Sequence, residues 1–394
     1  MKAFLDLLEK VLTWFFSLVF GALLIYLGLR WNNHRLDESD PWVQAHKKNT
    51  VEAYVEYLRT CQSCPHKAAA QKALDALHRG NGLIARLSDA HLPDLASINL
   101  PVFSPDARLI LALGGRTPDV WDAETGKRDS HGSKTFSRRG KAVAVDALDF
   151  APDGRRVGAG LAGDEGGRLM MWDLSTEALI GEHEVEGFDV KAVQFSPDGA
   201  WLGWRGDGPV GVWNPVSNRF LRGTHAEVGS IAFITTNGRV YLVSVAGRGL
   251  ITWEPTSMEI VSEQTLESDR PLLGLSHDGE VIAYTDGRVL ELWDTRSASL
   301  KASLRDLDGE ITAFCRETAT GNIVVGTRSG LVYLWDPRQV LPVGALSAHE
   351  GPVDALACGT GSRVVSIGWD GAKVWDLEKL KSQKQQDTET SRRF

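Results

Sequence analysis

Two cysteines and a histidine lie close together near the start of the chain, in Cys61-Gln62-Ser63-Cys64 and at His66. Residues of these types can hold a haem, a zinc ion or a redox-active disulfide. Covalent haem attachment needs the histidine directly after the second cysteine, and here Pro65 separates them. A structural zinc site needs four ligands, and thioredoxin-type redox chemistry belongs to a βαβ context that this stretch lacks. The sequence therefore predicts either a disulfide between Cys61 and Cys64 in an oxidising compartment or two free thiols, with no metal and no cofactor.

The most regular feature of the chain is a tryptophan followed by a polar residue. These pairs are Trp121-Asp122, Trp172-Asp173, Trp213-Asn214, Trp253-Glu254, Trp293-Asp294, Trp335-Asp336 and Trp375-Asp376. From these positions, successive tryptophans lie 51, 41, 40, 40, 42 and 40 residues apart. Turn clusters such as Ser196-Pro197-Asp198-Gly199 recur upstream with the same period, between two apolar runs, as expected of hairpins. A period near forty is typical of a propeller blade of four short strands.

The Ser-Pro-Asp-Gly turn followed by a strand that ends in Trp-Asp resembles the WD-repeat family, over about Leu83 to Leu377. The resemblance implies an all-β, seven-bladed propeller in which the start of the chain supplies the outermost strand of the last blade. The polar segment after Trp375-Asp376 contains no strand-like run, so Leu83–Leu87 is expected to be that closing strand. The resemblance also implies that His349, Ser366, Asp370 and Trp375 form a structural hydrogen-bond network in the last blade, and no catalytic residue is expected.

The N-terminal segment departs from the composition of a soluble protein. Val11 to Leu29 contains no charged residue over 19 positions, which as a helix spans about 28 Å, close to the thickness of a bilayer core. Asp6 and Glu9 are atypical of a signal peptide, and no cleavage site of small residues follows. We expect an uncleaved, single-pass anchor. The formal net charge of −8 argues against a nucleic-acid partner.

The basic residues before and after the span are nearly equal in number, so they do not determine which side of the membrane the propeller faces. The Cys61–Cys64 pair favours an oxidising compartment, so we expect a protein of a bacterial inner membrane whose propeller faces the periplasm.

Four regions follow from these patterns: an anchor over 1–39, a helical hairpin over 40–82, a propeller over 83–380 and a polar tail over 381–394. The hairpin is predicted as one helix from Pro41 to about Thr60 and a second from Ala68 to His78, and it resembles a single tetratricopeptide-like unit. The first repeat carries extra length over Asp122–Ala142 around an irregular outer strand. Cys315 and Cys358, on the inner strands of adjacent blades, are expected to be buried small apolar residues.

Candidate partner-binding residues come from the turns between the second and third strands of each blade, where the resemblance places the docking face. They are Trp204, Arg205, Arg248, Asp286, Arg328 and Trp369. Exposed Trp and Arg dominate binding hot spots, because they combine large area with directional hydrogen bonds. Trp369 is the first choice, since Trp375 already fills the core of that blade.

The sequence thus favours a membrane-anchored scaffold that binds other proteins and is not an enzyme. The alternative is a propeller enzyme, a hydrolase or quinone-dependent dehydrogenase, with its site in the central channel. An enzyme would need convergent carboxylates or histidines there, whereas the inner strands offer chiefly Ala, Val, Leu, Phe and Ser.

Overall fold

The computed structural model of the chain describes residues 40–60, 65–87, 101–114, 117–129, 136–138, 141–142, 145–162, 166–223 and 228–379. The chain divides into two compact units, Met1–Leu77 and His78–Phe394. The predicted membrane span over 11–29, the Cys61–Cys64 pair and the tail over 381–394 lie outside the described residues. Among the residues that are described, no helix is long and apolar enough to cross a membrane.

The first unit contains helices α2 (Pro41–Lys48), α3 (Val51–Thr60) and most of α4 (Lys67–Gly80). Helix α2 begins where Asp40 accepts a hydrogen bond from the backbone N–H of Trp42 at 2.8 Å. The prediction of one continuous helix up to Thr60 is wrong, because Asn49 adopts a left-handed φ of 47° and ends α2. The hydroxyl of Thr50 then accepts from the N–H of Ala53 at 3.2 Å and starts α3.

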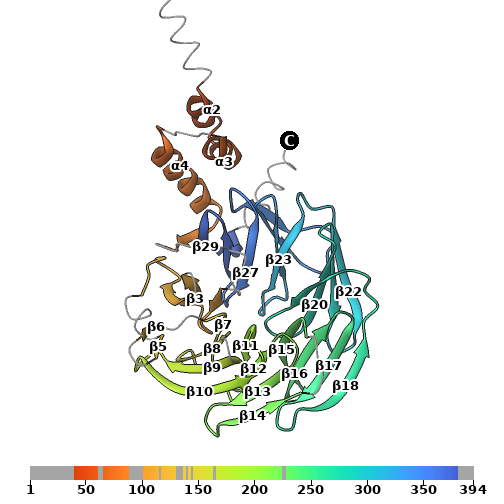
Figure 1. Ribbon diagram of the computed structural model, residues 1–394. Helices are drawn as coiled ribbons and strands as arrows, with labels where there is room; N and C mark the ends of the chain where they lie inside the picture. Colours follow the sequence, from red (N-terminus) through yellow and green to blue (C-terminus); the bar gives the residue numbers. More distant parts are fainter. Residues whose placement is uncertain are drawn as a thin grey trace, which may run out of the picture. The chain divides into compact units, whose positions relative to one another are not determined.

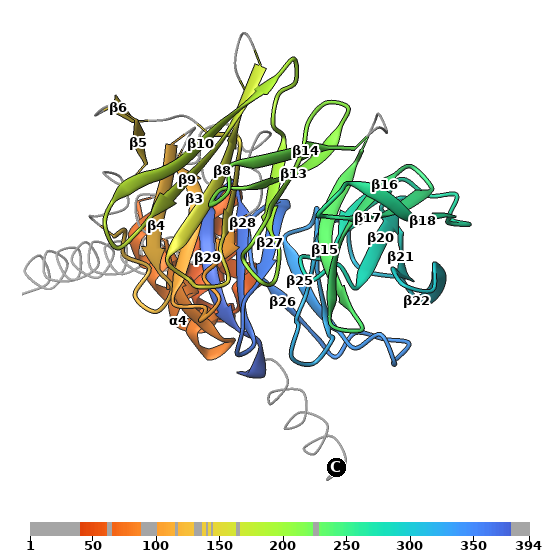
Figure 2. The same cartoon turned by 90° about the horizontal axis from the view of Figure 1, so that it is seen from below.

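The second unit is a ring of seven antiparallel sheets, each a blade of the propeller (Figures 1 and 2). Blade 1 is β2 (Val102–Phe103), β3 (Leu109–Gly114) and β4 (Thr117–Asp122); blade 2 is β7 (Ala147–Phe150), β8 (Arg156–Leu161), β9 (Gly166–Asp173) and β10 (Ala178–Glu186); blade 3 is β11 (Ala192–Phe195), β12 (Leu202–Arg205), β13 (Val210–Asn214) and β14 (Arg219–Arg222). Blade 4 is β15 (Ser230–Thr236), β16 (Arg239–Ala246), β17 (Gly249–Glu254) and β18 (Glu259–Thr265); blade 5 is β19 (Leu272–Leu275), β20 (Val281–Thr285), β21 (Val289–Asp294) and β22 (Ser299–Arg305). Blade 6 is β23 (Ile311–Arg316), β24 (Ile323–Thr327), β25 (Leu331–Trp335) and β26 (Gly344–Ser347); blade 7 is β27 (Val353–Cys358), β28 (Arg363–Gly368), β29 (Gly371–Asp376) and β1 (Leu83–Arg86).

The ring is closed by β1, as predicted. Strand β1 pairs antiparallel with β29, with Leu83 opposite Trp375, Ala85 opposite Val374 and Arg86 opposite Lys373. The first strand of the propeller therefore completes the last blade and covers an edge that would otherwise be open.

The repeated tryptophans form the cores between blades. Each of the seven apolar clusters of the ring contains one of them, and each is buried: Trp121, Trp172, Trp213, Trp253, Trp293, Trp335 and Trp375. The cluster around Trp375, for example, joins Val332 and Leu334 of blade 6 to Leu356 and Val364 of blade 7. Burial of these indoles between neighbouring sheets explains why their spacing is so regular.

The Ser-Pro-Asp-Gly turns join the first and second strands. In blade 3, the Ser196 hydroxyl donates to Asp198 at 2.5 Å and accepts from the N–H of Trp201 at 2.9 Å, while Gly199 adopts a φ of 68°. The serine, the aspartate and the glycine of the motif thus have separate roles in the turn.

The outer part of blade 1 is irregular, as the extra length of that repeat predicted. Beyond β4, the described residues continue the pairing through an isolated bridge between Trp121 and Arg128, and β5 (Ser137–Arg138) and β6 (Lys141–Ala142) form a separate two-stranded sheet. The Arg128 guanidinium pairs with Asp119.

Candidate functional site

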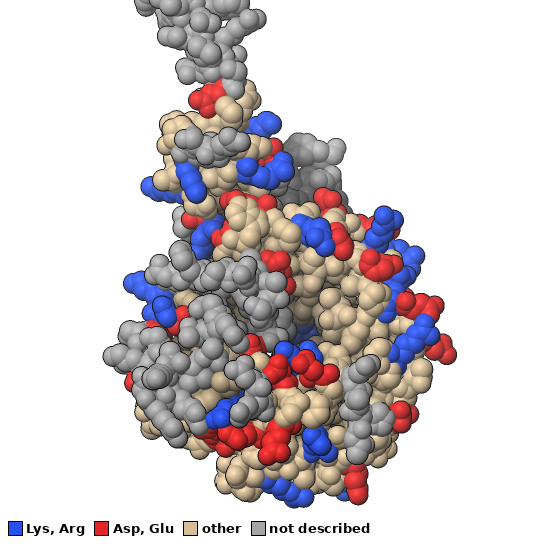
Figure 3. All heavy atoms as spheres, viewed as in Figure 1, with Lys and Arg blue, Asp and Glu red and all other residues tan. Residues whose placement is uncertain are grey.

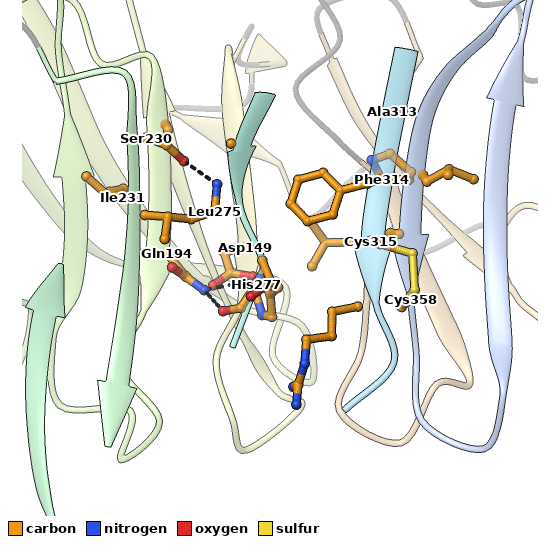
Figure 4. Close-up of a pocket in the computed structure, with 18 of the residues that line it drawn as sticks. Asp149, Gln194, Ser230, Ile231, Leu275, His277, Ala313, Phe314, Cys315 and Cys358 are labelled. Atoms are coloured by element: carbon orange, nitrogen blue, oxygen red, sulfur yellow. Dashed lines mark hydrogen bonds between the residues drawn. A yellow bond between two sulfur atoms is a disulfide. The ribbon is translucent and has the colours of Figure 1, made fainter. Parts of the chain in front are cut away.

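The innermost strands of all seven blades enclose a central channel of about 360 Å³. Much of its wall is apolar and includes Leu148, Val193, Ile231 and Phe314, and Figure 4 shows Phe314 directed into the space. This volume falls in the usual range of small-ligand sites.

Three polar side chains from different blades meet in the channel (Figure 4). The Gln194 amide nitrogen donates to the His277 carbonyl and lies 3.2 Å from His277 Nδ1. Asp149 Oδ2 accepts from the N–H of Phe195 at 2.7 Å, which links blade 2 to blade 3. Burial raises the pKa of Asp149 to about 6, although the charge of His277 opposes the shift. One oxygen each of Asp149 and Gln194 is buried with no hydrogen-bond partner among the described atoms.

The overall composition of the inner strands, which is mostly apolar, does not reveal this polar group. A positional signal was available, since Asp149 and Gln194 occupy the same place, one residue before the phenylalanine that precedes the turn, in Ala147–Phe150 and Ala192–Phe195.

The channel wall also contains a disulfide, and the expectation that Cys315 and Cys358 are merely buried apolar residues is wrong. They are bonded to each other across β23 and β27, with their Cα atoms 5.6 Å apart (Figure 4). Equivalent positions on the inner strands of adjacent blades face each other, so two cysteines there meet the geometry of a disulfide.

The predicted network of the last blade is present. Trp375 Nε1 donates to Ser366 Oγ at 2.8 Å, Ser366 lies 2.7 Å from His349 Nε2, and His349 Nδ1 donates to Asp370. Lys373 is also buried and donates to Asp370 at 2.7 Å. Burial opposes ionisation of Asp370, but its bonds to His349 and Lys373 outweigh burial and hold its pKa well below the usual range. The network is enclosed in the core and is structural.

The candidate binding residues are placed differently by the structure. Trp369, in the turn between β28 and β29, is 57% exposed, whereas Trp204 is fully buried in the core between blades 2 and 3, stacked on Phe220. The assignment of Trp204 to the docking surface is therefore wrong. Arg205 follows it in sequence but lines the channel.

The other three candidates are engaged in ion pairs near the same turns. Arg328 donates to Glu310 at 2.6 Å, Arg248 pairs with Asp269, and Asp286 pairs with Arg270. Asp286 also accepts from the N–H groups of Arg288 and Val289, so it holds its own turn. Figure 3 shows Lys and Arg interspersed with Asp and Glu over the face in view.

Comparisons with known proteins agree with this architecture. The chain is 28% identical to the WD repeat-containing protein 3 homolog of Dictyostelium discoideum over 159 residues, which cover 36% of the chain and 16% of that protein. It is 24% identical to the Periodic tryptophan protein 2 homolog of the same organism over 54% of the chain and 20% of that protein. It is also 30% identical to human WD repeat-containing protein 37 over 28% of the chain and 26% of that protein. The matches thus span about a quarter or less of the length of these relatives.

Among solved structures, the computationally designed Ika8 protein superposes with a TM-score of 0.52 and 21% identity, over 75% of this chain and 99% of that one. No model of a known protein family matches the chain. The likenesses identify the ring as a WD-repeat, seven-bladed β-propeller, a class that typically serves as a protein-binding scaffold.

Proposed function

We propose that this WD-repeat propeller is a membrane-anchored, non-catalytic scaffold that binds partner proteins through the face formed by the turns between second and third strands. The observation that carries the proposal is the exposure of Trp369, the one aromatic side chain among the exposed large apolar residues that the structure describes. Its indole lies over Gly351, where a Cβ atom would come within 2.2 Å of Trp369 Nε1. A large, preplaced aromatic surface is the usual anchor of a protein interface.

The tether rests on the uncharged 19-residue run from Val11 to Leu29. The Cys315–Cys358 disulfide supports a propeller on the oxidising side of the membrane, since such bonds persist in oxidising compartments and are rare in the cytosol. We therefore propose that the propeller faces the periplasmic side of a bacterial inner membrane.

One observation favours the alternative, an enzyme whose site lies in the channel. Asp149, with its raised pKa, and His277 are the kind of acid–base pair that catalysis uses. However, Asp149 is buried and bonded to the backbone of Phe195, so it already acts as a link between blades. We expect Asp149→Asn to affect stability, with no associated turnover to lose.

The proposal is tested by affinity purification of the full chain from detergent-solubilised membranes, with the co-purified proteins quantified by mass spectrometry. Trp369→Ala should reduce the recovery of a defined partner about tenfold or more, as loss of a hot-spot residue does. Val340→Ala is the matched control, because Val340 is 85% exposed in the turn between β25 and β26, at the opposite end of the strands. Equal recovery with both variants, or a large drop in melting temperature for Trp369→Ala alone, would contradict the proposed surface.

A further inference from the structure

The end of the channel that carries the turns between second and third strands has an unusual charge arrangement. We call this end the channel mouth and define it by Arg205, Ser230, Leu273, Thr312 and Asp354, all of which line the channel. Leu273, Thr312 and Asp354 come from blades 5, 6 and 7, and each stands where the pairing of the innermost strand shifts register. A bulge redirects the side chain at its position. Equivalent bulges in these three successive blades present the side chains of Leu273, Thr312 and Asp354 to the mouth.

Arg205 is the last residue of β12 and extends from blade 3. Its guanidinium donates to the carbonyl of Val228 at 3.4 Å, and no carboxylate of the described residues forms an ion pair with it. The nearby Asp207 lies 3.8 Å from Lys191, which also pairs with Asp189 at 3.3 Å. Burial lowers the pKa of Arg205 more than the charge of Asp207 raises it, so the positive charge is incompletely compensated.

Asp354 is the corresponding negative charge on blade 7. Its carboxylate is exposed and has no ion pair or hydrogen bond within the described part of the chain, and its pKa is raised by partial desolvation and by the charge of Asp370. In the order of the ring, blades 1 and 2 separate it from Arg205 on one side and blades 4, 5 and 6 on the other. The two unpaired charges therefore stand on opposite walls of the mouth.

The basic residues around the mouth provide the contrast. Arg248, Arg270 and Arg328, all near the turns of the same face, each pair with a carboxylate. Arg316, the other arginine that lines the channel, pairs with Asp278. Ser230 and Thr312 are also engaged, with Leu275 N–H at 3.1 Å and with the Val353 carbonyl at 2.6 Å. Arg205 and Asp354 are thus the two charged residues of the channel mouth, and neither has an ion-pair partner among the described residues.

We propose that the channel mouth binds a dipolar peptide segment of a protein partner, with an acidic side chain on Arg205 and a basic side chain on Asp354. The proposal rests on the proposed function and specifies the chemistry of the bound segment. Arg205 is partly buried without a counter-ion, which is unfavourable, and Asp354 lies exposed at the channel wall with none, so a ligand that supplies both counter-charges gains at both ends. A ligand with only one charge would leave the other end unpaired, and specificity follows from that penalty.

The test uses the full chain in detergent and blocked peptides Lys-(Gly)n-Glu, with one, two or three glycines, titrated by calorimetry at low salt. Isosteric peptides in which Gln replaces Glu, Met replaces Lys, or both, supply the comparison. Free glutamate and free lysine are titrated separately, to distinguish a peptide segment from a small metabolite. We expect at least one dipolar peptide to bind about tenfold more tightly than its single-charge analogues, with the difference decreasing as salt rises.

Two variants test whether Arg205 binds the acidic side chain of the peptide and Asp354 the basic one. Arg205→Gln should remove the preference for Glu over Gln, and Asp354→Asn should remove the preference for Lys over Met. Arg338→Gln is the matched control, because its guanidinium pairs with Asp336 in the turn between β25 and β26, at the opposite end of the strands, and it should change neither preference. Equal affinity of all peptides, tight binding of the free amino acids alone, or an equal effect of Arg338→Gln would each overturn the inference. Should Trp369→Ala still abolish partner recovery in that case, the proposed scaffold function would stand without it.

Discussion

At the scale of single residues, His78 is a buried histidine that packs against the core tryptophan of the last blade. It is 1% exposed, and its ring meets Trp375 edge-on with the ring centroids 5.3 Å apart. Burial, followed by the positive charge of Lys373, lowers the pKa of His78 to about 3. The imidazole is therefore uncharged in the folded ring at any pH at which the protein is expected to work.

A pH-dependent stability follows from this shift. The unfolded chain binds a proton at His78 below pH 6.5 and the folded chain does not until about pH 3, so the contribution of His78 to stability is present above pH 6.5 and is lost as the pH falls. We expect the free energy of unfolding to decrease by up to about 1.4 kcal/mol per pH unit more in the wild type than in His78→Phe. Denaturant melts between pH 7 and pH 5 measure the difference, and parallel pH profiles of the two proteins would refute it.

At the scale of elements, β1 has the clearest single task, which is to complete blade 7. Removal of residues through Ser88 should lower the melting temperature far more than removal through Asp40, because only the longer deletion strips β29 of its partner strand. Differential scanning calorimetry of the two truncated chains measures this. Equal melting temperatures would mean that the pairing of β1 with β29 contributes little.

The disulfide between β23 and β27 joins the innermost strands of blades 6 and 7, which are 43 residues apart in sequence. Replacement of Cys315 and Cys358 together by alanine should cost about 2–4 kcal/mol of stability and make the melting temperature of the ring insensitive to a reductant. The matched control is Cys61→Ser with Cys64→Ser, which leaves this bond in place. A double alanine variant as stable as the wild type would contradict a stabilising role.

The sequence was sufficient for features that recur and insufficient for features that depend on the register between blades. The tryptophan period predicted the seven sheets, and the lack of a strand after Asp376 predicted the role of Leu83–Leu87, because both are local signals repeated along the chain. The bond between Cys315 and Cys358 and the burial of Trp204 depend on which neighbouring blade faces a side chain. The Asn49 break was missed because apolar spacing continues through it, whereas the backbone does not.

At the scale of the whole molecule, the proposed tether predicts how the protein fractionates. The full chain should stay with membranes after an alkaline wash, since 19 uncharged residues match the bilayer core, while a chain that begins at Asp40 should be recovered in the supernatant. Immunoblots of the two fractions measure this. Release of the full chain, or a mature terminus beyond Leu29, would contradict the anchor.

The pairing of β1 with β29 also sets an order of events during synthesis. Strand β1 leaves the ribosome early, at Leu83–Arg86, but its partner begins only at Gly371. At about 5–20 residues per second, the first strand waits roughly 15 to 60 seconds before it can pair. During that time β1 is an unpaired strand. It can pair incorrectly with the edge of a blade that is synthesised before blade 7, or with a neighbouring chain. The ring can therefore close only after Gly371–Asp376 has been synthesised, and β1 must remain without its native partner until then.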